Sequence, residues 1–188
     1  DGTGNSLNNL LYAGVGDNVF DGDTGTDTVS YAYGVTGTTG VTINLTLASA
    51  QATGGSGSDT LFGIENLTGS ANADSLTGDS TANILDGGAG VDTMIGGDGS
   101  DTYYVRNVGD IVSETNATAS TGGTDLVYSY LSSYSLGTNV EIGRILATGA
   151  ANLTGNNLAN LLYAGAGNNV LNGGSGIDTV SYAYGLAG

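Results

Sequence analysis

Acidic and amide side chains recur along this chain at the ends of glycine-rich turns, a pattern suited to binding a hard cation. The clearest example is GGAGVDTMI (residues 87–95) followed directly by GGDGSDTYY (residues 96–104), each with Asp at its sixth position. Carboxylate and carbonyl oxygens in a flexible site are the ligands that calcium prefers, whereas magnesium demands a small octahedral shell. His and Cys are absent, so zinc and other transition metals are disfavoured. These residues predict calcium sites.

The composition argues against several other functions. Eighteen Asp and Glu residues oppose two cations, Arg106 and Arg144, which gives a net charge of −16. Nucleic-acid binding needs clustered Lys and Arg, and no apolar run approaches the ~20 residues of a membrane span. Without His, the usual acid–base group and the usual activator of a Ser nucleophile are missing. We therefore expect no nucleic-acid binding, no membrane insertion and no catalysis.

Two nested repeats must position the acidic residues. The short one has nine residues, with Gly at positions one, two or four, Asp or Asn at six and an apolar residue at eight; its units begin at residues 4, 13, 22, 54, 69, 78, 87, 96, 155, 164 and 173. The long one has about 151 residues, because residues 4–34 recur as residues 155–185. This predicts the end of one tandem unit in residues 1–34, the main part of a unit in 35–154 with a calcium-rich block in 54–104, and the start of the next unit in 155–188.

The nonapeptides resemble the GGxGxDxUx repeat of RTX (repeats-in-toxin) proteins. The connecting stretches GIENLTGSANADSLTGD and NVEIGRILATGAANLTGNN also look like the bridging segments of that family. The resemblance implies an all-β fold, a parallel β-roll or β-helix solenoid with calcium ions in its turns. It also implies a bacterial protein exported by type I secretion, so that this chain would be secreted or held at the cell surface.

In such a solenoid, two nonapeptides make one coil and residues 18 apart stack on the same edge. This predicts the pairs Asp74/Asp92, Asn83/Asp101, Asn9/Asp27 and Asn160/Asp178. Asp59 is expected to stack on Asp74 across a shortened coil of 15 residues, whereas Asn18 and Asn169 lack an Asp partner and favour an amide ladder without an ion. The predicted metal-binding residues are Asp27, Asp59, Asp74, Asn83, Asp92, Asp101 and Asp178, with Gly87, Ala89, Gly96 and Asp98 of the same turns.

The segments between the nonapeptides are expected to continue the solenoid with wider coils. Residues 33–53 alternate as a strand, with Val41, Ile43, Leu45 and Leu47 on one face. Residues 105–124 read as irregular strands and loop. Residues 124–136 carry a possible helical stripe, but their Tyr, Ser and Val content favours strands.

The pattern predicts a structural element of an adhesin, S-layer or filament that folds on calcium after export and associates with neighbouring copies of itself. A repeat domain attached to a secreted hydrolase or other enzyme is the first alternative. An ice-binding solenoid would need a regular Thr array, and the position-seven Thr residues are interrupted. A glycan-binding platform, built on tyrosines such as Tyr128 and Tyr130, is the remaining alternative.

Overall fold

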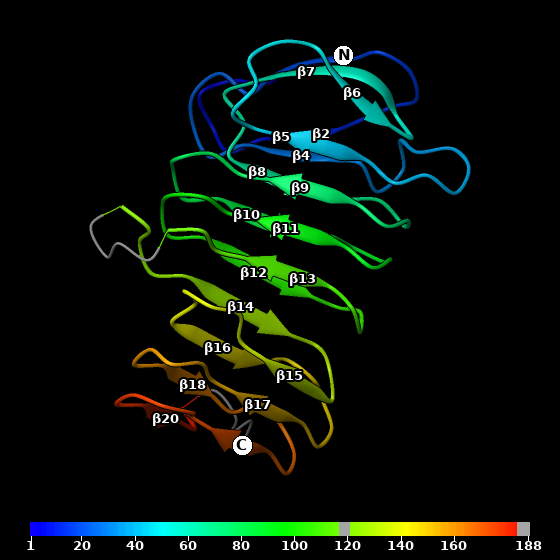
Figure 1. Cartoon of the computed structure of the whole chain (residues 1–188). Coiled ribbons are helices and arrows are strands. Elements are labelled where there is room, and N and C mark those ends of the chain that lie inside the picture. Colours follow the sequence, from blue (N-terminus) through cyan, green and yellow to red (C-terminus); the bar gives the residue numbers. More distant parts are fainter. Residues whose placement is uncertain (117–120, 184–188) are drawn as a thin grey trace.

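Short strands joined by tight turns wind into a stack of coils along one axis (Figure 1). The computed structural model describes residues 1–116 and 121–183; Tyr184 and the residues after it, at the end of the second repeat copy, lie outside this range. The described residues contain twenty strands and no helix. Accordingly, they include no helix capable of crossing a membrane. The predicted all-β parallel solenoid is confirmed.

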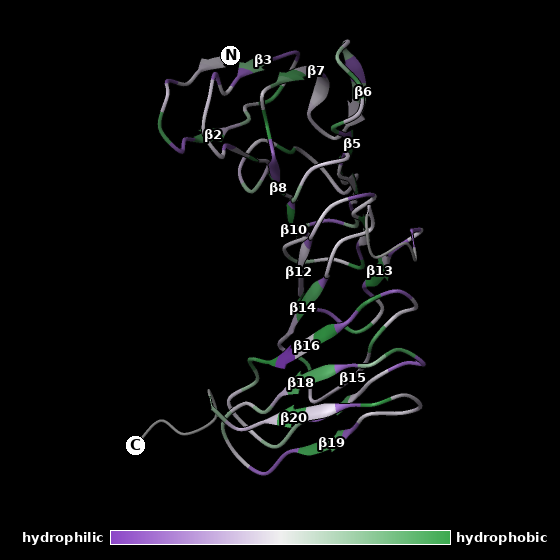
Figure 2. Ribbon diagram, turned by 90° about the vertical axis from the view of Figure 1, so that its left-hand side faces the viewer, coloured by the Kyte–Doolittle hydropathy of each residue, from purple (hydrophilic) through white to green (hydrophobic). Residues whose placement is uncertain are grey.

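One long parallel sheet runs the length of the stack, and Figure 2 shows its strands from β8 to β20 in one column. Its pairing advances by one coil per strand, with Leu85 in register with Leu67 on one side and with Tyr103 on the other. Its strands, in spatial order, are β2 (Leu10–Tyr12), β4 (Thr28–Ser30), β8 (Asn66–Thr68), β10 (Ile84–Asp86), β12 (Thr102–Val105), β14 (Leu126–Ser129), β16 (Ile142–Ile145), β18 (Leu161–Tyr163) and β20 (Thr179–Ser181).

Three smaller sheets form the opposite side of the coils. The first contains β1 (Gly2–Thr3), β3 (Val19–Asp21), β7 (Gly57–Phe62) and β6 (Gln51–Gly54). The second contains β13 (Ile111–Ser113), β11 (Thr93–Ile95), β9 (Ser75–Thr77) and β5 (Thr42–Asn44). The third contains β15 (Ser133–Ser135), β17 (Asn152–Thr154) and β19 (Val170–Asn172). Residues 124–136 thus form strands β14 and β15, as predicted.

The core is a column of side chains between these two sides. Most strands have three residues, and the middle one points inward because side chains alternate across a strand. Position eight of the nonapeptide takes this place and is buried at Phe20, Val29, Leu61, Leu76, Leu85, Met94, Tyr103 and Leu162. Val180 is 41% exposed, because β20 is the last strand of the long sheet in the described residues and no strand covers its other side.

An inserted segment, residues 31–56, changes the predicted stacking order. Strand β7 pairs with β3, so Asp59 lies beside Asn18, while β5 of the insertion pairs with β9 and takes the place next to Asp74. The predicted stacking of Asp59 on Asp74 is therefore wrong. The strand predicted for residues 33–53 is also too long: Val41 and Ile43 are buried, but a turn follows Asn44 and Leu47 is 43% exposed.

Candidate metal sites in the turns

The residue before each strand lies at an edge of the solenoid, where its side chain reaches the neighbouring coil. We call the set that precedes the long-sheet strands the first ladder: Asn9, Asp27, Glu65, Asn83, Asp101, Asp125, Glu141, Asn160 and Asp178. The second ladder, on the opposite side, has two parts: Asn18 with Asp59, which lies within β7 but is level with Asn18, and Asp74, Asp92 and Asp110. Tight glycine turns bring the ladder residues of the nonapeptides to the edges, and the nine-residue period keeps them aligned.

Within both ladders, one side-chain oxygen of each acidic residue accepts a backbone N–H from the coil before it. The Asp74 amide donates to Asp92 Oδ1 at 2.9 Å, and the Asn83 amide donates to Asp101 Oδ1 at 2.7 Å. The amides of Asn9 and Asn160 donate in the same way to Asp27 (2.7 Å) and Asp178 (2.9 Å). The structure therefore contains the four stacked pairs that the 18-residue spacing predicts.

Four ladder residues outside the predicted nonapeptides escaped the sequence analysis. The Asp27 amide donates to a side-chain oxygen of Glu65 (2.7 Å), and the Asp92 amide donates to one of Asp110 (3.2 Å). In the same way, the Asp101 amide donates to Asp125 (2.8 Å) and the Asp125 amide donates to Glu141 (2.9 Å). A signal was present, because each of these acidic residues directly precedes a short apolar strand, as in IENLT, GDIV, TDLV and VEIG. The connecting coils therefore continue the ladders without the glycine pattern.

Asp59 gives Asn18 an acidic neighbour that the sequence spacing did not predict. The Asn18 amide donates to Asp59 Oδ1 at 2.8 Å, and Asn18 Nδ2 donates to the same oxygen at 3.2 Å. The expectation that Asn18 lacks an Asp partner is therefore wrong. Its cause is the insertion, which lets a residue 41 positions away stack on this turn.

The second oxygen of several carboxylates is buried without a hydrogen-bond partner among the described residues. These atoms are Oδ2 of Asp27, Asp92 and Asp101. A buried charged oxygen is costly unless it is paired, and nearly all buried polar groups in proteins have partners. A hard cation such as calcium therefore fits as the partner of these oxygens, because the same turns offer it further oxygens.

The first glycine of each turn leaves room where these oxygens converge. A β-carbon on Gly69 would lie 2.4 Å from Asp74 Oδ2 and 2.5 Å from the Gly87 carbonyl oxygen of the next coil. A β-carbon on Gly87 would lie 2.3 Å from Asp92 Oδ2. The arrangement recurs at Gly78, where a β-carbon would overlap both Asn83 Oδ1 and the carbonyl oxygen of Gly96. Carboxylate and carbonyl oxygens from two coils thus gather in one small space.

Burial and neighbouring carboxylates disfavour the ionised form of two ladder carboxylates. Burial raises the pKa of Asp92 to about 6, and the neighbouring carboxylates of Asp74, Asp110 and Asp86 raise it too, against the lowering effect of the Asp74 amide. Burial likewise raises the pKa of Asp101 to about 6. A bound cation would favour the ionised forms.

Both arginines of the chain contact side chains on the strands of the long sheet and just after them. Arg106 forms a bidentate pair with Asp86 and lies over the rings of Tyr104 and Tyr130. The guanidinium group of Arg144 lies over the ring of Tyr128. Arg106 thus joins β10 to β12 and to the turn after β14, and Arg144 of β16 lies against β14.

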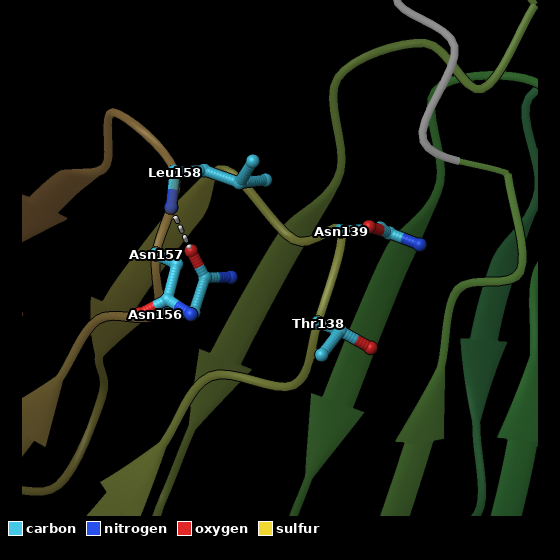
Figure 3. A pocket seen from close by; sticks show the side chains of 5 residues that line it. All are labelled: Thr138, Asn139, Asn156, Asn157 and Leu158. Atoms are coloured by element: carbon cyan, nitrogen blue, oxygen red, sulfur yellow. Dashed lines mark hydrogen bonds between the residues drawn. The ribbon is translucent and has the colours of Figure 1, made fainter. Parts of the chain in front are cut away.

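In turns that carry Asn, amide groups donate to the carbonyls that surround the space. Asn156 Nδ2 donates to the carbonyls of Gly137 (2.6 Å) and Val140 (2.7 Å), and Asn160 Nδ2 donates to Val140 at 3.0 Å. Figure 3 shows this region, where the turns before β16 and β18 line a shallow pocket and the Leu158 amide donates to Asn156 Oδ1. Asn169 Nδ2 similarly donates to the carbonyls of Gly165 and Gly167. In these turns the N–H groups of the Asn side chains take the place that a cation would have beside the carbonyl oxygens.

The remaining predicted residues lie in the same turns with other partners. The Ala89 amide donates to the Ser70 carbonyl at 3.3 Å. Asp98 Oδ1 accepts a hydrogen bond from Asn116 Nδ2 at 2.5 Å. Asp178 is half-buried, and its Oδ2 would lie 2.2 Å from a β-carbon on Gly173.

Parallel coils with stacked carboxylates at their turns define a class of protein, the metal-binding β-solenoids. The sequence pattern of the RTX calcium-binding nonapeptide repeat matches this chain four times, at residues 3–31, 51–63, 68–103 and 147–180, which together cover more than half of it. The chain belongs to this family, and its repeats form a calcium-binding module. A search of curated proteins finds no match to the chain.

Proposed function

We propose that this chain is a structural module of a secreted or cell-surface bacterial protein, and that calcium completes its fold after export. The observation that carries the proposal is the buried carboxylate oxygens of Asp27, Asp92 and Asp101 that have no partner among the described residues. Without a cation they destabilise the folded chain, and with one they join neighbouring coils. The side chains described are suited to this role and not to catalysis.

The thin core makes the calcium contribution decisive. Thirty-five glycines increase the backbone entropy lost on folding, and each three-residue strand buries little more than one side chain. A ligand that binds only the folded state stabilises it by RT ln(1 + [L]/Kd) per site, which is about 1.4 kcal/mol at a tenfold excess over its dissociation constant, and the contributions of several sites add. Extracellular modules bind calcium at roughly 10⁻⁴–10⁻³ M. The chain would thus remain unfolded in the cytosol and fold outside the cell.

Far-ultraviolet circular dichroism of the chain tests this proposal. In millimolar calcium we expect a β-type spectrum and a cooperative thermal transition, whereas excess EGTA should give the spectrum of a largely unfolded chain. Addition of calcium beyond the EGTA should restore the β signal. Millimolar magnesium is the control ion and should not restore it. An unchanged β spectrum and thermal midpoint in excess EGTA would falsify the proposal.

The 151-residue repeat supports an architectural role within an adhesin, S-layer or filament. Tandem solenoid units extend an array by stacking on their neighbours, and residues 4–34 and 155–185 are near-copies of each other. Association with neighbouring copies of the module is part of this proposal. Further copies of the unit in the full gene would favour it. An adjacent catalytic domain would favour the alternative, a repeat domain that assists export and folding of a secreted enzyme.

The surface of the long sheet supports neither ice nor glycan binding. Thr28, Thr102 and Thr179 occupy equivalent strand positions, but Asn66, Ile84 and other residues separate them in the register. Tyr104 and Tyr128 stack with ring centroids 5.1 Å apart, and Arg106 and Arg144 lie over their faces. These ring faces are therefore already engaged within the chain, and a sugar ring would have to displace an arginine.

A further inference from the structure

Three buried carboxylates meet where the nonapeptide block joins the wider coils. An oxygen of each of Asp101, Glu114 and Asp125 lies within 4.8 Å of the others. The three residues are only 1%, 4% and 1% exposed. Glu114 and Asp125 lie outside the residues that match the nonapeptide repeat, so the glycine pattern does not account for this cluster.

The cluster arises because Glu114 takes the place of a first-position glycine. Gly96 directly follows β11 and opens the turn that ends at Asp101, and Glu114 directly follows β13 and opens the next turn on the same side, which ends at Asp125. Unlike glycine, Glu114 sends a side chain into the space between the turns. A β-carbon on Gly96 would lie 2.5 Å from Glu114 Oε1 and 2.2 Å from Asp101 Oδ2.

Hydrogen bonds hold one oxygen of each group and leave others without a partner. Asp125 Oδ1 accepts the Asp101 amide at 2.8 Å, and Glu114 Oε1 accepts the hydroxyl of Tyr103. Asp101 Oδ2 and Glu114 Oε2 are buried and have no partner among the described residues. Burial raises the pKa of Glu114 to about 8, and the carboxylates of Asp125 and Asp101 raise it too, against the hydrogen bonds from the Tyr103 hydroxyl and the Gly97 amide. Burial also raises the pKa of Asp125 to about 7.

We propose that Asp101, Glu114 and Asp125 hold a calcium ion of their own, bound more tightly than the ions between two nonapeptide turns. Three carboxylates surround this position, whereas Asp74 and Asp92 bring two, and calcium affinity rises with the number of charged ligands. The ion would fasten the coil that contains β13 and β14 to the nonapeptide of residues 96–104. This inference takes from the proposed function only that calcium is the cation.

Calcium titration of the metal-stripped chain by isothermal calorimetry tests the site with the substitution Glu114→Gln. The substitution keeps the shape of the side chain and removes one of the three charges. We expect the tightest binding event of the wild type to be lost or weakened by about tenfold or more, with the weaker events retained. Asp23→Asn removes the same charge from an exposed residue outside the ladders and should leave every event unchanged.

A second measurement reports on the site itself, and a variant that keeps the charge separates loss of the ligand from loss of the fold. Tb³⁺ bound beside Tyr103 should emit when tyrosine is excited, and the first equivalent should give less emission in Glu114→Gln than in the wild type. Glu114→Asp, which keeps the charge, should restore part of the tight binding. Equal affinity and equal first-equivalent emission in wild type and Glu114→Gln would overturn the inference. If the wild type still folds on calcium in that case, the proposed function stands without this site.

Discussion

At the scale of the residue, the first glycine of a turn is required by the carboxylate of that turn. A β-carbon on Gly87 would lie 2.3 Å from Asp92 Oδ2, and one on Gly173 would lie 2.2 Å from Asp178 Oδ2. Atoms at these distances overlap, so any side chain must displace the carboxylate. The glycine therefore keeps the oxygen in place as well as shaping the turn.

Gly87→Ala is expected to weaken calcium binding and destabilise the calcium-loaded chain by roughly 1–3 kcal/mol, the usual cost of overpacking. Urea unfolding in saturating calcium measures the stability, and calorimetry measures the affinity. Gly14→Ala is the matched control, because a β-carbon there meets no atom within 4 Å. Equal losses for the two substitutions would mean that the destabilisation does not come from overlap with Asp92, because the effect of alanine on the unfolded chain is by itself stabilising.

At the scale of the element, each strand of the long sheet contributes mainly one side chain to the core. Leu67, Leu85 and Tyr103 are in register across β8, β10 and β12, and each is at most 1% exposed. The flanking residue Ile84 of β10 is 41% exposed. A strand this short cannot redistribute its packing to other residues, so the inward position should be intolerant of truncation.

Leu85→Ala is expected to lower the free energy of unfolding by about 2–5 kcal/mol, because it opens a cavity in a column one side chain wide. Ile84→Ala, in the same strand, should cost less than about 1 kcal/mol. Denaturant unfolding in saturating calcium compares the two. Similar losses for both would show that the sheet, and not the inner column, carries the stability of this coil.

At the scale of the whole molecule, repulsion among 18 acidic residues could oppose folding in two ways. Exposed carboxylates repel one another through solvent, where salt screens them, whereas buried ladder carboxylates such as Asp92 and Asp101 are screened much less. Only an ion bound in the turns relieves the repulsion among the buried ladder carboxylates. The two contributions can therefore be separated by comparing a screening salt with calcium.

The metal-stripped chain in 1 M sodium chloride is expected to recover little of the β signal that millimolar calcium produces. High salt shortens the Debye length to about 3 Å but supplies no ligand for the buried oxygens. Circular dichroism at equal protein concentration in the two solutions gives the comparison. Recovery of the full β spectrum in sodium chloride would mean that general charge repulsion, and not site binding, controls folding.

The local register of this solenoid could be predicted from the sequence alone. The nine-residue period determines which side chain of each strand points inward, as at Leu85, and which residue ends each turn, as at Asp92. Because two periods complete one coil, the stacked pair Asp74/Asp92 followed from simple spacing. These features depend on neighbours within one or two coils, so a repeated local pattern is sufficient to specify them.

The partners across an irregular connection were decided only by the tertiary structure. The insertion of residues 31–56 sends β7 to β3 and places β5 beside β9, so Asp59 meets Asn18 and Asp74 meets Val41. Glu114 reaches Asp101 because it follows β13 at the position where Gly96 follows β11, and unlike glycine it carries a side chain. Spacing along the chain cannot predict such contacts, because the length and path of an irregular segment determine which coil lies next to which.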